Sequence, residues 1–131
     1  LLKHHDGVNI PCCRLVESGK LESGIYAINT MRELGYNFGY DLKNFPRERW
    51  EKYANSIKKD TVAPGGLFMP AIFETKRFME AGGYESERYS VNPYFMPDDK
   101  LFEKMVNEYH MKHITVFDSI VYHVQEGEKD E

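Results

Sequence analysis

Two adjacent aspartates, Asp98 and Asp99, are the clearest candidates for acid–base chemistry in the sequence. They follow a stretch without periodicity and begin a segment whose apolar residues recur at helical spacing, so we expect them at a helix N-terminus. A carboxylate placed there could act as a general base at the rim of a cleft. Because Asp is also a favoured N-cap residue, a purely capping role is the alternative interpretation.

The histidines form the second group of candidates. His123 directly follows a short apolar run, and imidazole is a common ligand of divalent metals together with carboxylates, which makes His123 a candidate metal ligand. A hydrogen-bonded residue at the end of a strand is the alternative. His110 and His113 lie three residues apart near the end of a predicted helix, where a favourable interaction with the helix dipole is a simpler explanation than metal binding.

A glycine pair, Gly65-Gly66, precedes Leu67 and a short apolar run. Glycines before a strand allow the backbone to approach a ligand closely, although a structural turn is the default interpretation. The spacing matches neither a P-loop nor a G-x-G-x-x-G fingerprint, and no G-x-S-x-G, H-E-x-x-H or EF-hand pattern occurs in the sequence.

Helices and short apolar runs alternate around these candidates. Helical spacing predicts helices over residues 21–34, 46–59, 74–80 (with Phe78 and Met79 inward) and 98–110. Apolar runs predict strands that begin at Leu67 and that cover 114–117 and 120–122, with a turn over 62–66, a loop over 84–97 and a break at Asp118-Ser119. This alternation indicates an α/β or α+β domain, and we expect an α/β fold with a mixed sheet and flanking helices.

Composition limits the possible classes of function. The chain has 131 residues, of which 41% are hydrophobic, enough for one domain with an apolar core. Its net charge of −4 disfavours nonspecific binding to nucleic acid or anionic membranes. No apolar run approaches the about 20 residues that span a bilayer. Cys12 and Cys13 are adjacent and cannot readily pair, so we expect two buried thiols in a reducing, cytoplasmic location.

Three motifs follow one another in the second half of the chain. They are Gly65-Gly66-Leu67-Phe68-Met69 with the stretch Phe73 to Tyr84, then Pro97-Asp98-Asp99-Lys100-Leu101-Phe102, and then Ile120-Val121-Tyr122-His123. In this order they resemble the family 2 glycosyltransferases of the GT-A fold, in which a glycine-rich strand, an acidic pair at the start of a helix and a strand ending in histidine succeed one another. The resemblance covers residues 61–124 as the acceptor-side core, with 1–60 as a variable helical region and 125–131 as an acidic tail.

The resemblance implies a role for each matching residue. Asp99 would be the catalytic base for inverting transfer from a nucleotide-sugar donor to a carbohydrate or other hydroxyl acceptor, and Asp98 would orient the acceptor or the base. His123 would help to hold a divalent metal, Mn²⁺ or Mg²⁺, on the donor diphosphate. The acceptor side would be lined by Gly65, Gly66 and Leu67.

The sequence also departs from the family pattern. The family's D-x-D motif is absent, and no N-terminal nucleotide-binding βαβ half is recognisable. We therefore expect a partial GT-A-like domain without the Rossmann-like half, inactive by itself, and the start at Leu1 rather than Met agrees with this expectation. Exposed sheet edge and apolar surface would favour homo-oligomers.

Two other functions remain open. The chain could be a non-catalytic α/β binding or interaction module, with Asp98 as a helix cap and His123 as a packed strand residue. It could also be a small metal-dependent hydrolase that uses His110, His113 and His123 with Asp118. The transferase requires Asp99 and His123 on one side of a sheet, whereas the hydrolase requires at least two histidines on one metal.

Overall fold

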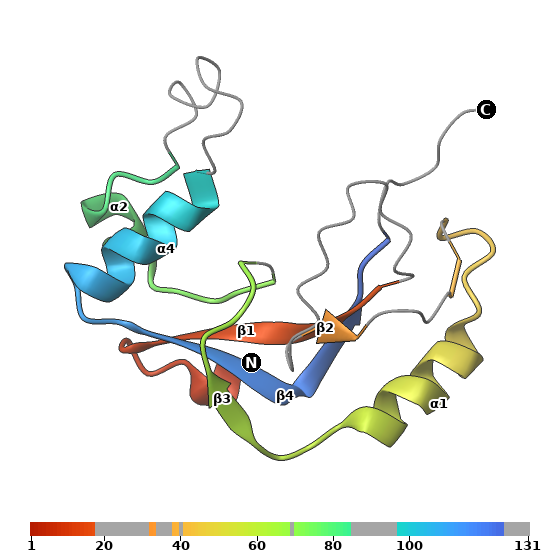
Figure 1. Cartoon of the computed structure of the whole chain (residues 1–131). Coiled ribbons are helices and arrows are strands. Elements are labelled where there is room, and N and C mark those ends of the chain that lie inside the picture. Colours follow the sequence, from red (N-terminus) through yellow and green to blue (C-terminus); the bar gives the residue numbers. More distant parts are fainter. Residues whose placement is uncertain (18–31, 34–37, 40, 69, 85–96, 125–131) are drawn as a thin grey trace.

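The computed structural model describes residues 1–17, 32–33, 38–39, 41–68, 70–84 and 97–124, and for residues 32, 33 and 97–99 it describes the backbone alone. The elements in chain order are η1 (Leu2–His4), β1 (Asn9–Val16), β2 (Arg32–Glu33), α1 (Arg47–Ile57), β3 (Val62–Pro64), α2 (Thr75–Glu80), α4 (Pro97–Asn107) and β4 (Lys112–Tyr122) (Figure 1). The chain is an α/β domain with a mixed sheet, as the sequence predicts.

The sheet has the strand order β2-β1-β4-β3. β1 pairs in parallel with both β2 and β4, whereas β3 pairs antiparallel with β4 at the edge. The register places Asn9 opposite Lys112 and Val16 opposite Tyr122. β1 and β4 therefore reach the same edge of the sheet with their carboxyl ends.

The main core lies between α4 and the first half of β1. Leu101, Phe102 and Met105 are buried on one side of α4 and share a cluster with Ile10 and Cys12 of β1. Helical spacing brings these three side chains onto one stripe, which explains why α4 docks on the sheet. Figure 1 shows α2 beside α4, and the two helices contact each other.

β4 is continuous where the sequence predicts two strands with a break. The expected interruption at Asp118-Ser119 is present as a bulge, because Cys13 faces Val116 whereas the next residue, Arg14, faces Ile120. The η1 end of the chain packs at this bulge. Lys3 Nζ lies 2.6 Å from Asp118 Oδ2, and the N-terminal amine donates a hydrogen bond of 3.1 Å to Ser119 Oγ.

Helices are predicted better than strands. The helices expected over 46–59, 74–80 and 98–110 are confirmed as α1, α2 and α4. The prediction that Met79 points inward is wrong, because this residue is 69% exposed. The helix expected over 21–34 is wrong at Arg32–Glu33, which form β2, and the remainder of that range lies outside the described residues.

The prediction of a strand that begins at Leu67 is also wrong. The strand in this region is β3, which lies earlier, within the segment predicted to be a turn. Pro64 is compatible with β3 since an edge strand tolerates a residue without an N–H donor. Of the loop expected over 84–97, residues 85–96 lie outside the described residues and Pro97 already belongs to α4.

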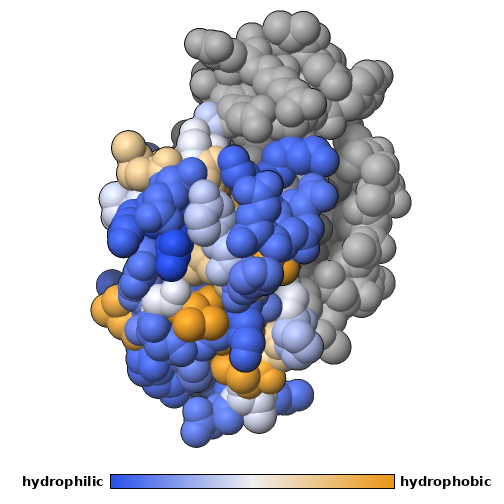
Figure 2. Space-filling model, turned by 90° about the vertical axis from the view of Figure 1, so that its left-hand side faces the viewer, coloured by the Kyte–Doolittle hydropathy of each residue, from blue (hydrophilic) through white to orange (hydrophobic). Residues whose placement is uncertain are grey.

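The described surface is mainly polar. Figure 2 shows hydrophilic residues over most of the described part of one face, with separate apolar patches between them. Large apolar side chains that are exposed belong to several different elements and loops: Leu2, Val8, Leu42, Val62, Met79 and Tyr84. In the described ranges there is no helix with the length and apolar character needed to cross a membrane.

Candidate functional site

The acidic pair lies in the first turn of α4. The helix begins at Pro97, a residue suited to the first helical position, so Asp98 and Asp99 follow at the positive end of the helix dipole. Leu101 and Phe102, one turn further, are 3% and 2% exposed and fix this end of the helix on the core. The carboxylates themselves lie outside the described side chains. The backbone is thus placed as the sequence predicts.

His123 lies at the carboxyl edge of the parallel strands. Its backbone N–H donates to the carbonyl of Val16 at 2.9 Å, which extends the pairing of β1 with β4 by one residue. Its Nδ1 lies 2.7 Å from Oε1 of Glu17, which is buried at 1% exposure, while the His123 side chain is 41% exposed. The imidazole therefore contacts a buried carboxylate through Nδ1 and is partly exposed to solvent.

An aromatic cluster supports the same edge. The ring of Tyr122 packs within 6 Å, between centroids, of three other rings: Phe38, Phe45 and Trp50. Its hydroxyl accepts a hydrogen bond from the N–H of Phe38 at 3.2 Å and donates one to the carbonyl of Gly39 at 2.8 Å. This cluster fixes the residue next to His123, so the end of β4 is anchored by α1 as well as by β1.

The glycine segment lies along the other half of β4. The N–H of Gly65 donates to the carbonyl of His113 at 2.7 Å, and Thr115 Oγ1 donates to the carbonyl of Gly65 at 2.9 Å. Leu67 contributes a carbonyl 2.9 Å from His113 Nε2. Since His123 follows the opposite end of the strand, the described contacts of Gly65, Gly66 and Leu67 are to the beginning of β4 and not to His123.

Gly66 is packed too tightly for a side chain. A Cβ at this position would lie 2.8 Å from His113 Nε2 and 3.0 Å from Thr115 Oγ1. We expect Gly66→Ala to lower the free energy of unfolding by about 1–3 kcal/mol, because overpacking displaces well-packed neighbours. Urea unfolding measures this loss. It should shrink in a His113→Ala background, where the nearest contact is removed, and an equal loss in both backgrounds would contradict the steric explanation.

His113 contacts Cys12 inside the core. Cys12 Sγ lies 2.9 Å from His113 Nε2, and because the Leu67 carbonyl can only accept, Nε2 carries the hydrogen and donates to it. Burial raises the pKa of Cys12 to about 12 and lowers the pKa of His113. The thiol and the imidazole are both neutral at pH 7, so this pair is not an activated nucleophile. Cys12 and Cys13 are buried and free, as the sequence predicts.

The lowered pKa of His113 predicts acid sensitivity. Its first cause is desolvation by burial, which disfavours the charged imidazolium in the folded state. The unfolded chain therefore binds the proton more readily, and the free energy of unfolding should fall as the pH drops below about 6.5, the usual histidine pKa. Urea unfolding from pH 8 to pH 5 measures this slope. His113→Gln should flatten it, and an unchanged slope would contradict the assignment.

The hydrolase candidates are spread over the domain. His110, with φ of 55°, lies in the turn after α4, His113 is packed against Cys12, and His123 lies at the far end of β4. Asp118 pairs with Lys3. Within the part of the chain that the structure describes, no three side chains of the His, Cys, Asp and Glu types are grouped so that they could hold a metal ion. The described residues therefore do not assemble the hydrolase cluster.

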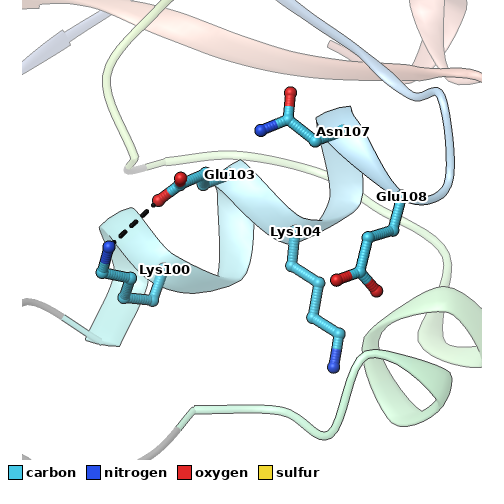
Figure 3. A pocket seen from close by; sticks show the side chains of 5 residues that line it. All are labelled: Lys100, Glu103, Lys104, Asn107 and Glu108. Carbon is cyan, nitrogen blue, oxygen red and sulfur yellow. Dashed lines mark hydrogen bonds and ion pairs between the residues drawn. The ribbon is translucent and has the colours of Figure 1, made fainter.

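A hollow of about 340 Å³ lies on the outer side of α4 (Figure 3). Its described lining comes from this helix and the turn after it: Lys100, Glu103, Lys104, Asn107 and Glu108. Lys100 and Glu103 form an ion pair of 3.2 Å, and the basic and acidic groups balance. The described lining begins one residue after Asp99 and consists of lysine, glutamate and asparagine side chains.

Glu17 and the aromatic cluster are not predicted from the sequence. Glu17 follows an apolar run that we did not predict as a strand, and Trp50 appears in the sequence only as one residue of a helical stripe. An acidic residue directly after an apolar run is the signal in the sequence that could have indicated Glu17.

Comparison of the chain with models of known protein families, with curated proteins and with solved structures finds no match.

Proposed function

We propose that this chain is the acceptor-side portion of an inverting glycosyltransferase with a GT-A-like fold. One observation carries the proposal: the acidic pair lies in the first turn of α4, and His123 directly follows β4 at the carboxyl edge of the parallel strands β1 and β4. Ligands of open α/β sheets bind outside the carboxyl ends of the strands. This placement supports the roles that the sequence motifs imply.

In the proposed reaction, Asp99 removes the proton of the acceptor hydroxyl while the acceptor oxygen attacks the anomeric carbon of the donor sugar. The new carbon–oxygen bond forms as the bond to the diphosphate breaks on the opposite side, so the configuration is inverted. A hydroxyl is a weak nucleophile until a positioned base takes its proton, and general base catalysis supplies about a hundred- to ten-thousand-fold. Asp98 orients the acceptor or the base.

His123 would be a single donor to the divalent metal. Its side chain is 41% exposed, but oxygen atoms of carboxylates, carbonyls and water, rather than imidazole, are the usual ligands of both Mn²⁺ and Mg²⁺. The described residues supply no set of three donors, so diphosphate oxygens and water would complete the coordination. When bound, the metal would neutralise charge on the departing nucleotide diphosphate.

The proposed function is tested with this chain joined to its native upstream sequence. We expect transfer from one of a panel of UDP- and GDP-sugars, with an anomeric configuration opposite to that of the donor in NMR of the product. The chain alone should not transfer. Retention of configuration would contradict the base role of Asp99, and absence of transfer with every donor and a broad acceptor panel would favour the second candidate.

That second candidate is a non-catalytic α/β binding or interaction module. The contact between His123 Nδ1 and Glu17 Oε1 also suits a purely structural role at the end of two strands. In this case Asp98, the second residue of α4 and not its N-cap as the alternative interpretation expects, only offsets the helix dipole, and its substitution by alanine should cost about 0.3–1 kcal/mol of stability.

A further inference from the structure

We propose that Pro64 closes the β3 edge of the sheet to strand pairing with a second copy of this chain. The strand order places β3 at one end of the sheet, where β4 is its neighbour among the described strands. The outer side of an edge strand can pair with a strand of another molecule, and a second copy brings the same edge. The proposal concerns the sheet alone and does not depend on the proposed transfer reaction.

The hydrogen bonds to β4 show which residues of β3 direct their backbone groups outward. The carbonyl of Thr61 accepts a hydrogen bond of 3.0 Å from β4, and the N–H of Gly65 donates one of 2.7 Å to the carbonyl of His113. Backbone groups alternate in direction along an antiparallel strand. Val62 and Pro64, which lie between these contacts, therefore direct their backbone groups away from β4.

This outer side is accessible. Val62 is 48% exposed although it is a large apolar residue, and Thr61 and Pro64 are exposed as well. Figure 1 shows β3 at the margin of the sheet, with no described strand beyond it. A β-branched residue on an open edge favours pairing with another strand, so this edge needs a feature that prevents pairing.

Pro64 removes half of the hydrogen bonds that self-pairing would make. Two antiparallel copies of β3 related by a two-fold axis at Ala63 bring Val62 of each copy opposite Pro64 of the other. Ordinary residues in such a pair exchange both N–H···O bonds. Proline has no N–H, so the bond from the Val62 N–H to the Pro64 carbonyl remains and its reciprocal is lost, while the ring faces the incoming strand.

Other features of β3 act in the same direction. The strand is only three residues long, and two exposed lysines, Lys58 and Lys59, precede it. Short length, lysine and proline are all means by which proteins protect sheet edges. A two-fold axis at Val62 gives no better contact, because it leaves one bonded pair with a proline ring on either side. Association of copies would therefore be directed away from β3.

The proposal is tested with Pro64→Val, which restores the missing N–H and removes the ring. We expect a dimer in analytical ultracentrifugation, with self-association about five- to a hundredfold tighter than in the unmodified chain, because the two-fold contact regains two hydrogen bonds. Pro70→Val is the matched control, since Pro70 is exposed but lies outside β3, with its carbonyl bonded to the N–H of Cys13. It should leave the association unchanged.

Val62→Lys separates pairing of β3 from association through other surfaces. Added to Pro64→Val, it should abolish the gain in association, and in the unmodified chain it should change nothing. Weaker association of the unmodified chain on Val62→Lys would show that the β3 edge is in use and overturn the proposal. A folded Pro64→Val that associates no more tightly than the unmodified chain would also overturn it. Circular dichroism shows folding, and Pro64→Ala, which restores the same N–H, replaces a variant that does not fold.

Discussion

Asp99→Asn is expected, in the proposed transferase, to lower kcat for sugar transfer by about a hundred- to ten-thousand-fold, because the amide cannot take up the acceptor's proton. The amide keeps the size and most hydrogen bonds of the carboxylate, so folding and donor binding should change little. Initial rates at saturating donor and acceptor measure the loss, and thermal unfolding shows whether the variant is folded.

Asp98→Asn is the matched control, since it makes the same change one residue earlier in the first turn of α4. Because Asp98 would orient the acceptor or the base and would not take up the proton, we expect a smaller fall in kcat than for Asp99→Asn. Undiminished transfer by Asp99→Asn would reject this residue as the base. Equal losses in both variants would show that the charge of the pair, and not one base, is required.

Phe102→Ala is expected to give the largest loss of stability, about 3–5 kcal/mol, the usual cost of removing a buried aromatic ring. Phe102 is 2% exposed, and its ring lies 5.0 Å from that of Phe68 and 4.8 Å from that of His113. The side chain therefore joins α4 to the start of β4. Urea unfolding followed by circular dichroism measures the change in the free energy of unfolding.

Glu103→Ala, at the next and exposed position of α4, is the control and should change stability by no more than about 0.5 kcal/mol. Since Phe102 lies three residues after Asp99, its loss should also loosen the turn that carries the acidic pair. A loss below about 1 kcal/mol for Phe102→Ala would contradict the packing of α4 on the sheet.

The helices could be predicted because their signals are local. Trp50, Tyr53 and Ala54 recur at helical spacing within α1, and the stripe from Leu101 to Met105 indicates α4 with the acidic pair at its start. Gly82 and Gly83 both have positive φ, as expected for glycines that end α2. These patterns depend on neighbours along the chain, so sequence alone shows them.

The inner strand β1 could not be predicted in the same way. β1 is buried from Ile10 to Val16, so it lacks the alternation of a half-exposed strand, and Pro11 argues against a central position. The position of Glu17 depends on β1, because Glu17 directly follows this strand. Its contact with His123, 106 residues away, follows from the parallel pairing and the bulge, neither of which is visible in a local pattern.

The most direct test of the proposed site is the relative position of Asp99 and His123 in an experimental structure of the chain joined to its upstream sequence, with UDP and Mn²⁺ bound. We predict that both side chains face one cleft, with His123 coordinating the metal and the Asp99 carboxylate open to the acceptor side. Side chains on opposite faces of the sheet, or a metal bound without His123, would contradict the account.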